Sequence, residues 1–343
     1  MMIQIVNIED AVGYPLAHDI TEIRAGEFKG PAFQKGHMLT CRDLDHLRRL
    51  GKDHLYIISP ETGEMHEDDA AEVIANALCG EGVSWDEAPR EGKISIKATC
   101  DGLLKVDVDV LNSFNGFGDV MCATRHSNTI VKKGDQVAAT RAIPLLIAKN
   151  IVDSAVAVAN SSRESVLQVK PMFKARAGVL ITGSEVYYGR IEDKFESVIR
   201  KKVTALKGEV MDVAFLPDDD TMIAEAALRM VEKGVNVLIT TGGMSVDPDD
   251  RTRFALKQAG ATNILYGSPV LPGAMFMVSA LKGVPVLGIP ACGLFAKTTM
   301  FDLIYPRILA GDKITRADIA ATGHGGLCLK CRQCTFPDCA FGK

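Results

Sequence analysis

Residues 235–250, VNVLITTGGMSVDPDD, decide the fold of the C-terminal half of this 343-residue chain. The apolar start of the stretch predicts a buried strand, which ends in Thr240-Thr241-Gly242-Gly243. A double glycine lets the backbone pass close to a ligand, because no Cβ stands in the way. The helix that follows would turn its free N–H groups toward the same crevice, which suits a phosphate. We therefore expect this turn to line a binding site, although a tight strand-to-helix connection gives the same pattern.

Two further apolar strands end in tips of the same kind. Residues 178–181 lead into Thr182-Gly183-Ser184-Glu185, and residues 284–289 lead into Pro290-Ala291-Cys292-Gly293. Ligands bind open α/β sheets beyond the C-terminal ends of the strands. The three tips together predict a single pocket at one edge of a sheet.

The pattern around these strands predicts a layered domain over residues 174–315. Apolar strands alternate there with amphipathic helices, which favours a three-layer α/β/α fold around a mostly parallel sheet. Residues 276–281 and 284–289 are separated only by Lys282-Gly283, and this spacing predicts an antiparallel hairpin inside the sheet.

The N-terminal half predicts two smaller modules, a mixed α/β module over residues 1–85 and a β-rich and helical module over residues 86–173. Period-two alternation indicates half-buried strands, and longer amphipathic runs indicate helices. The expected elements are helices over 41–50, 66–80 and 142–160, strands over 93–110, and a hairpin-like element over 129–137 that turns at Gly134.

Bulk properties exclude several classes of protein. The formal net charge is −4, so there is no basic field for nucleic acid or for an anionic membrane. No apolar run approaches the roughly 20 residues that a membrane span needs. The N-terminus lacks the basic start and apolar middle of a signal peptide. We expect a cytoplasmic protein with no nucleic-acid or membrane partner.

Residues 316–343 are expected to form a separate cysteine-rich tail. Cys328, Cys331, Cys334 and Cys339 have C-x2-C-x2-C-x4-C spacing. Four thiolates suit structural zinc, and the spacing approaches that of iron–sulfur proteins, although the last gap is one residue longer. A flexible, thiol-bearing tail is the alternative. Disulfides are not expected in a reducing cytoplasm.

Several of these motifs resemble those of a known family. Residues 175–312 are similar to the molybdopterin-binding domain of the molybdopterin molybdenumtransferase (MoeA) family. The matching pieces are Thr182-Gly183-Ser184-Glu185-Val186, Pro217-Asp218-Asp219, Thr241-Gly242-Gly243-Met244-Ser245-Val246, Pro272-Gly273 and Gly288-Ile289-Pro290. The first 170 residues resemble the upstream domains of the family more loosely, and a segment with an aspartate-glycine-tyrosine core is missing.

This resemblance implies a role in molybdenum cofactor metabolism. Family members hold adenylylated molybdopterin, insert molybdate at its dithiolene and release the nucleotide, and the resemblance also implies a homo-oligomer. Carboxylates suit this chemistry because Mg²⁺ binds them together with phosphate oxygens and orients the attacking water. The candidate catalytic residues are Glu185, Asp218, Asp250 and Asp193. The candidate cofactor-binding residues are Thr182, Gly183, Ser184, Thr241, Gly242, Gly243, Ser245, Pro272, Gly273 and Pro290.

Each carboxylate also has a purely structural interpretation. Asp250 and Asp193 would each cap a helix, Asp218 would start the helix expected from residue 221, and Glu185 would be a solvated loop carboxylate.

The chain departs from the family in ways that bear on function. Leu271-Pro272-Gly273-Ala274 stands where the family carries lysine-proline-glycine-lysine, and Phe195 replaces an asparagine. Without those lysines the cleft should hold an oxyanion such as molybdate more weakly. Three functions stay open: an enzyme that inserts molybdate, a non-catalytic carrier that presents molybdopterin to a molybdenum enzyme, and a nucleotide-binding structural protein. In the carrier the cysteine tail would serve for docking or metal binding.

Overall fold

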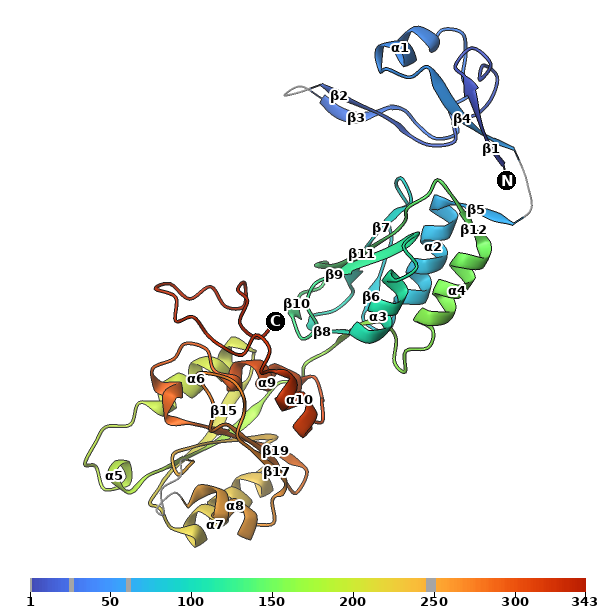
Figure 1. Ribbon diagram of the computed structural model, residues 1–343. Helices are drawn as coiled ribbons and strands as arrows, with labels where there is room; N and C mark the ends of the chain where they lie inside the picture. The colour runs from blue at the N-terminus through green and yellow to red at the C-terminus, as the bar shows by residue number, and fades with distance from the viewer. Residues whose placement is uncertain (1, 25–27, 60–62, 245–250) are drawn as a thin grey trace. The chain divides into compact units, whose positions relative to one another are not determined.

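The computed structural model describes residues 2–24, 28–59, 63–244 and 251–343. The chain divides into two compact units (Figure 1). The first unit comprises Met1–Ser127 and Val131–Val169, and the second comprises Asn128–Ile130 and Lys170–Lys343. Among the described helices, none combines the length and the apolar character needed to cross a membrane.

The second unit is built on a six-stranded sheet. The first four strands in spatial order pair in parallel, and the last two pair antiparallel at one edge. The order is β15 (Glu209–Leu216), β14 (Arg176–Thr182), β16 (Val237–Thr241), β19 (Val284–Ile289), β18 (Met277–Leu281) and β17 (Thr262–Tyr266). The mostly parallel sheet and the β18–β19 hairpin confirm two predictions from the sequence, whereas the edge strand β17 was not anticipated.

The central strands are apolar throughout because helices cover both faces of this sheet, as parallel sheets require. Val179 and Ile239 pack into a cluster with α6 (Phe195–Ala205), α9 (Met300–Leu309) and α10 (Arg316–Ala321). Leu180 and Leu238, their neighbours in sequence, pack on the opposite face against α7 (Asp220–Glu232) and α8 (Thr252–Gln258). Figure 1 shows the two helical layers on either side of the sheet. The three-layer fold is therefore confirmed.

The C-terminal residues belong to this second unit, which corrects the expectation of a separate tail over 316–343. Phe341 is buried in the same cluster as Phe301 and Ile319. The backbone N–H of Gly342 donates to the carbonyl of Gly325, with 3.0 Å between nitrogen and oxygen. Burial of Phe341 and partial burial of Phe336 stabilise this folded-back arrangement.

The first unit contains two hydrophobic clusters. One lies within residues 8–57, where α1 (Leu44–Arg49) packs near the antiparallel pair of β1 (Met2–Asn7) and β4 (His54–Ser59). The other lies within residues 70–169. Its strands are β5 (Glu64–His66), β6 (Val83–Ser84), β7 (Lys93–Ala98), β8 (Gly102–Val106), β9 (Val120–Thr124), β10 (Ile130–Val131), β11 (Gln136–Ala142), β12 (Leu146–Ala148) and β13 (Leu167–Lys170). Its helices are α2 (Glu67–Leu78), α3 (Val108–Asn115) and α4 (Lys149–Ala159).

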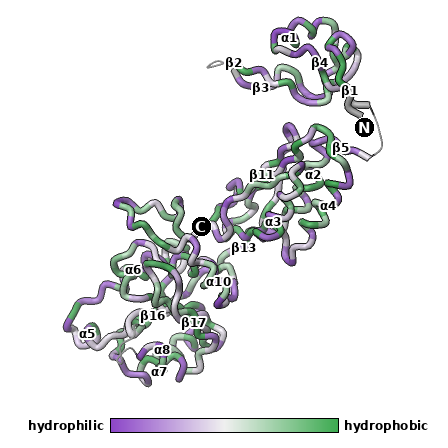
Figure 2. The backbone as a smooth tube through the Cα atoms, viewed as in Figure 1, coloured by the Kyte–Doolittle hydropathy of each residue, from purple (hydrophilic) through white to green (hydrophobic). Residues whose placement is uncertain are grey.

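The first cluster is completed by the hairpin of β2 (Ile20–Arg24) and β3 (Phe28–Phe33). In Figure 2 hydrophobic and hydrophilic residues alternate along α2 and α4, as expected for helices with one face on a core. The boundary expected after residue 85 divides a single core, because Ile74 and Leu78 of α2 pack with Ile94 and Ile96 of β7. The structure therefore separates residues 8–57 from a module that runs to residue 169.

Three local expectations in this unit were wrong in part or in full. The strands expected over 93–110 are present as β7 and β8, but β8 ends at Val106, because the Asp107 carboxylate accepts the backbone N–H of Val110 at 3.2 Å and starts α3. Residues 129–137 do not form a hairpin, because β10 and β11 lie in different sheets. The helix expected from residue 142 begins only at Lys149, because β12 before it pairs with β5.

The turn after β16 brings two backbones into close contact. Gly242 has φ +78°, and a Cβ at this position would lie 1.9 Å from the carbonyl oxygen of Thr182, at the end of β14. Only glycine allows both the backbone conformation and the close approach. Gly234, by contrast, has φ +90° with nothing within 4 Å of its Cβ position.

We expect Gly242→Ala to destabilise this unit more than Gly234→Ala does. Both changes carry the cost of positive φ, about 1 kcal/mol, but only the alanine at 242 collides with backbone, which adds at least about 2 kcal/mol. Urea unfolding followed by circular dichroism measures the difference. Equal losses in the two variants would contradict the close contact.

An ion pair stabilises the C-terminal residues of the second unit. Burial alone would raise the pKa of Asp318, but hydrogen bonds from Thr315 and Arg307 lower it to about 2. Arg307 is largely buried and also donates to Asp312 at 2.9 Å. The ionised carboxylate therefore fastens the start of α10 to α9.

We expect Asp318→Asn to lower the free energy of unfolding by about 1 kcal/mol at neutral pH, after allowance for solvent screening. A carboxyl group whose pKa is lowered in the folded state stabilises the protein above its unfolded pKa. The difference between wild type and variant should therefore shrink as pH falls below about 4 and vanish near 2. Denaturation at several pH values tests this, with the exposed Asp338→Asn as control. A difference independent of pH would contradict the ion pair.

Candidate functional site

The ends of three neighbouring strands lie side by side in the second unit. Strand β16 lies between β14 and β19. Thr241 pairs in register with Ile181 on one side and with Ile289 on the other. Because the parallel strands end at the same level, the segments that begin at Gly183, Gly242 and Pro290 all emerge at one edge of the sheet.

A pocket of about 650 Å³ opens at this edge. Two of the strand ends, the loop after residue 270 and the C-terminal segment all contribute to its wall, as does the start of α5 (Ser184–Tyr187). The lining residues are Glu185, Gly242, Gly243, Met244, Leu271, Pro272, Gly273, Ala274, Met275, Pro290, Ala291, Cys292, Leu327, Cys328 and Lys330.

The C-terminal segment is held in the wall by backbone hydrogen bonds. The N–H of Leu271 donates to the carbonyl of Gly326, and the N–H of Cys328 donates to the carbonyl of Leu271, both at 2.9 Å. Leu271 and Leu327 thus form a short parallel bridge. We call residues 326–330 the C-terminal strap, because they run across the loop that carries Pro272 and Gly273.

The chemistry of the pocket is mainly apolar with one charge of each sign. Among the described residues that line it, Glu185 supplies the carboxylate and Lys330 the ammonium group. Met244 is held in the wall by its carbonyl, which accepts the Tyr266 hydroxyl at 2.6 Å. Apolar walls with a few placed polar groups are typical of sites for small organic ligands. The geometry suits a flat ligand that carries an anionic group.

Six of the residues predicted from the sequence lie around this pocket. They are Glu185, Gly242, Gly243, Pro272, Gly273 and Pro290. The two consecutive glycines matter most here, because both have positive φ and both Cβ positions are occupied by neighbouring atoms. The absent side chains at the end of β16 thus make room for Thr182 and Thr252, and at these two positions only backbone lines the pocket.

Four predicted cofactor-binding residues do not line the pocket. The Thr182 hydroxyl donates to the Thr241 carbonyl at 3.0 Å and lies 2.7 Å from the Thr252 hydroxyl, so it joins β14, β16 and α8. The Thr241 side chain is itself fully buried. Gly183 and Ser184 frame the turn behind Glu185, and the Ser184 N–H donates to Asp218 at 2.8 Å. These residues shape the site from behind it.

Two of the four predicted catalytic carboxylates bind backbone groups. Asp218 accepts the Ser184 N–H, and Asp193 accepts the N–H groups of Phe195 and Glu196 at 3.0 and 2.9 Å. Asp193 therefore serves the start of α6, in line with its structural interpretation. Asp218 does not start α7, because Asp219 caps that helix by accepting the N–H of Met222 at 2.8 Å. Asp250 and Ser245 lie outside the described residues.

The described carboxylates do not fit a magnesium site. The described residues contain no group of three or more histidine, cysteine, aspartate or glutamate side chains arranged to hold a metal ion. Glu185 alone among the described carboxylates borders the pocket, whereas Asp218 and Asp193 are engaged elsewhere. We therefore assign no step to Mg²⁺.

In the described structure Cys328, Cys331, Cys334 and Cys339 do not form such a group either, and the four-cysteine metal centre stays a prediction. Cys331 and Cys334 are exposed, whereas Cys328 lies in the wall of the pocket. The N–H of Phe336, with help from the Thr298 hydroxyl, lowers the pKa of Cys334. Burial raises the pKa of Cys292, which lines the pocket beside the strap, so this group is a neutral thiol at pH 7. Of the four tail cysteines, Cys328 and Cys339 pack against the core of the unit, whereas Cys331 and Cys334 are exposed.

The part of the pocket wall that the strap forms was not predicted from the sequence. Leu327, Cys328 and Lys330 follow Leu271 by more than fifty residues, and no local pattern announces that they pair with it. The cysteine spacing drew attention to this segment for a different reason. The one available signal was the apolar character of Leu327 and Leu329 between cysteines.

Comparison with known proteins connects this pocket to a class of ligand. Residues 178–310 match the family described as a probable molybdopterin binding domain. Residues 5–59 match a domain of unknown function, DUF8806. The described pocket residues from Glu185 to Cys292 fall within the first match.

The curated relatives include molybdopterin molybdenumtransferases. That of Haemophilus influenzae is 29% identical over 157 residues, which are 43% of this chain and 38% of that protein. That of Synechococcus elongatus is 26% identical over 147 residues, 40% of this chain and 36% of that protein. A CinA-like protein of Mycobacterium tuberculosis is 39% identical over 79 residues, 23% of this chain and 18% of that protein.

The chain thus spans less than two fifths of the length of these relatives. A solved structure, the molybdopterin biosynthesis enzyme MoaB of Thermus thermophilus, is 19% identical, covers 40% of this chain and 98% of that one, and has a TM-score of 0.34. By sequence, residues 178–310 match a probable molybdopterin binding domain, and about two fifths of the chain is similar to part of the molybdopterin molybdenumtransferases.

Proposed function

We propose that this protein holds molybdopterin, free or adenylylated, in the pocket beneath the C-terminal strap and presents it to a molybdenum enzyme. The observation that carries the proposal is the make-up of the pocket wall. Bare backbone at Gly242 and Gly243, apolar side chains and the single ammonium group of Lys330 meet there. The role belongs to molybdenum cofactor biosynthesis.

The pocket wall offers suitable groups for the pterin ring, for its polar atoms and for the phosphate of molybdopterin. A flat pterin can lie against glycine backbone and against Met244 and Leu271, since both kinds of surface exclude water from its faces. Pterin nitrogen and oxygen atoms would find partners in free backbone groups of the turn. The phosphate of molybdopterin is an anion, and Lys330 is the described cation of the wall.

The contacts of four charged side chains favour the holding of molybdopterin over the insertion of molybdate. Asp218 and Asp193 are engaged with backbone N–H groups. Arg251 pairs with Asp220, at 2.9 Å for one of its two contacts, and Arg190 lies 5.6 Å from the centre of the Tyr188 ring. Neither arginine lines the pocket. Molybdate is a dianion, and a wall with one ammonium group and one carboxylate attracts it weakly.

Molybdate insertion is the second candidate function, and Glu185 favours it. Its carboxylate borders the pocket and is exposed. A free carboxylate near an adenylate could accept a proton from an attacking water. In that case the protein would release AMP from adenylylated molybdopterin when molybdate is present.

One experiment separates these functions. The purified protein is mixed with adenylylated molybdopterin, molybdate and Mg²⁺, and both bound pterin and released AMP are measured after gel filtration. Retained pterin without AMP above the protein-free control supports holding. Release of AMP together with molybdenum-loaded pterin supports insertion. Absence of retained pterin refutes both proposals and leaves the structural nucleotide-binding protein. The elution volume also tests the homo-oligomer that the resemblance implies.

We expect Lys330→Gln to weaken molybdopterin binding about tenfold, because one charge-assisted hydrogen bond to phosphate is lost. Arg332→Gln removes an equal charge from an exposed neighbour that does not line the pocket, and it should leave affinity unchanged. Fluorescence titration of the pterin measures both. Equal weakening in the two variants would show a general charge effect and no contact at Lys330.

We expect Glu185→Gln to leave pterin retention and the AMP background as they are in wild type, because a holding protein needs no general base. The Glu185 side chain is exposed, so the change should not disturb folding. Quantified AMP over several hours provides the measurement. Wild-type release that disappears in Glu185→Gln would instead establish the transferase reaction.

A further inference from the structure

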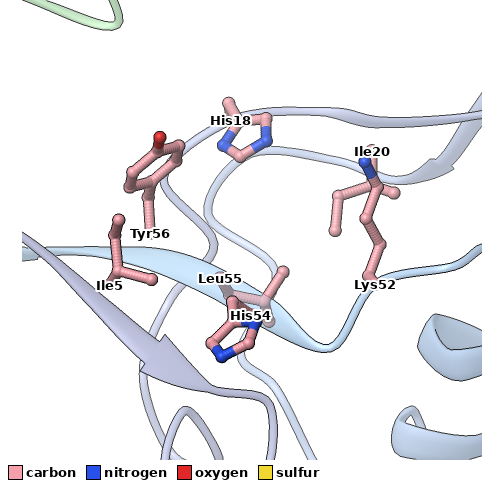
Figure 3. Close-up of a pocket in the computed structure, with 7 residues that line it drawn as sticks. All are labelled: Ile5, His18, Ile20, Lys52, His54, Leu55 and Tyr56. Atoms are coloured by element: carbon pink, nitrogen blue, oxygen red, sulfur yellow. The ribbon is translucent and has the colours of Figure 1, made fainter.

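A second pocket lies in the N-terminal unit, within the residues that match the domain of unknown function. Its volume is about 440 Å³. Figure 3 shows the side chains around it, which come from β1, from β4 and from residues 18–20. The lining residues are Ile5, His18, Ile20, Lys52, His54, Leu55 and Tyr56.

Strand pairing places two of the polar groups on one face. In the antiparallel pair β1–β4, Ile5 is opposite Tyr56 and Asn7 is opposite His54. Alternation along β4 turns His54 and Tyr56 to one side, while the buried Leu55 and Ile57 turn their side chains to the core. The polar face of this strand is therefore open to the pocket.

His18 closes the pocket from the segment before β2. Its ring centre lies 6.1 Å from that of Tyr56, at an angle of 58°. The preceding Leu16 and Ala17 are buried and anchor this segment in the core. In Figure 3 the two rings lie close together and Lys52 extends its amine toward Ile20.

The described side chains that line this pocket carry positive charge and no negative charge. Its polar groups are two imidazoles, an ammonium group and a phenol, and none of the described lining residues is a carboxylate. The nearest carboxylates with an influence on His18 are Asp19 and Glu91. Asp19 accepts the Lys35 N–H at 2.6 Å and Glu91 accepts the Thr21 hydroxyl at 3.3 Å, so both already have partners.

An unpartnered ring nitrogen of His18 also indicates that this pocket binds a ligand. Its Nδ1 atom is buried and has no hydrogen-bond partner among the described residues. Burial, and then the nearby Lys52, lowers the pKa of this imidazole, which is neutral at pH 7 as a result. A buried nitrogen without a partner costs roughly 1–3 kcal/mol. An anion beside Lys52 would offset the unfavourable field of that ammonium group on the ring.

A metal ion is a poorer occupant. The pocket offers only two metal-ligating side chains, His18 and His54, and the described chain holds no group of three or more such residues. The apolar side chains of Ile5 and Ile20 would also contact an organic body better than a hydrated ion.

We propose that this pocket binds a small organic oxyanion, a phosphate monoester or a carboxylate, with its oxygen atoms at Lys52, His54 and Tyr56 and its apolar body against Ile5 and Ile20. The Lys52 ammonium group, an imidazole N–H of His54 and the Tyr56 phenol donate hydrogen bonds to the oxygens. The site lies in the first unit and is independent of molybdopterin binding in the second. It gives the N-terminal module a ligand-sensing or substrate-holding function of its own.

Ligand-observed NMR on the full chain tests the proposal. The probes are phenyl phosphate, benzoate and the uncharged benzyl alcohol. One of the two anions should bind at least about tenfold more tightly than the alcohol, as expected for a charge-assisted contact. Tighter binding of phenyl phosphate identifies the ligand as a phosphate monoester, and tighter binding of benzoate identifies it as a carboxylate. Binding of neither anion at low ionic strength, or equal binding of the alcohol, overturns the proposal.

Matched variants locate the site. Lys52→Gln should weaken binding of the preferred anion about tenfold. Arg42→Gln removes the same charge from an exposed position in the same module that does not line the pocket, and it should have no effect. Tyr56→Phe, which keeps the ring and removes only the hydroxyl, should weaken binding while retaining the fold. If Lys52→Gln and Tyr56→Phe bind as wild type does, the anion lies elsewhere and the assignment is wrong.

Discussion

The close passage of β16 beside the end of β14 is the constraint on which the second unit depends. The backbone of Gly242 lies so near the Thr182 carbonyl that a Cβ would be placed 1.9 Å from it. Thr182 then uses its hydroxyl to reach the Thr241 carbonyl and the Thr252 side chain. One contact region thus joins two central strands and the start of α8. With the strands fixed in this way, their ends have no freedom to separate, and a pocket forms beyond them.

The C-terminal strap completes that pocket through a second set of backbone contacts. Leu271 exchanges hydrogen bonds with Gly326 and Cys328, which brings Lys330 to the wall. The strap is anchored in turn by Phe341 in the core and by the Arg307–Asp318 ion pair at the start of α10. A relative of the molybdenumtransferases without the usual cleft lysines therefore has a cation at its pocket from a different part of the chain. Under the proposed holding function, this single cation would serve the phosphate of molybdopterin.

The two units present different chemistry to ligands. The pocket of the second unit is apolar and nearly balanced in charge, which suits a flat ring with one anionic group. The pocket of the first unit is smaller and has cationic and hydrogen-bond-donating groups without a lining carboxylate among the described residues. The chain thus combines a unit that matches a probable molybdopterin binding domain with a module whose pocket has a different chemistry.

Much of the second unit followed from the sequence alone. The apolar runs at β14, β16 and β19, with glycine or proline at each end, predicted a buried parallel sheet and the meeting of three strand ends, because strand period and turn chemistry are local properties. Glu185, Gly242 and Pro290 were found in this way. The sequence could not show that Asp218 and Asp193 bind backbone N–H groups, since a carboxylate near a helix start has the same pattern in either role.

Only the tertiary structure decided the rest. The strap lies at the pocket because Leu271 pairs with residues far along the chain. The two-residue repeat that begins in β8 gives way to a helix from Val108, because Asp107 caps it. Likewise, the cysteines of the tail have metal-like spacing, but Cys328 and Cys339 pack against the core beside Phe336 and Phe341 whereas Cys331 and Cys334 are exposed. Spacing along a chain determines which groups can meet, whereas long-range packing determines which of them do.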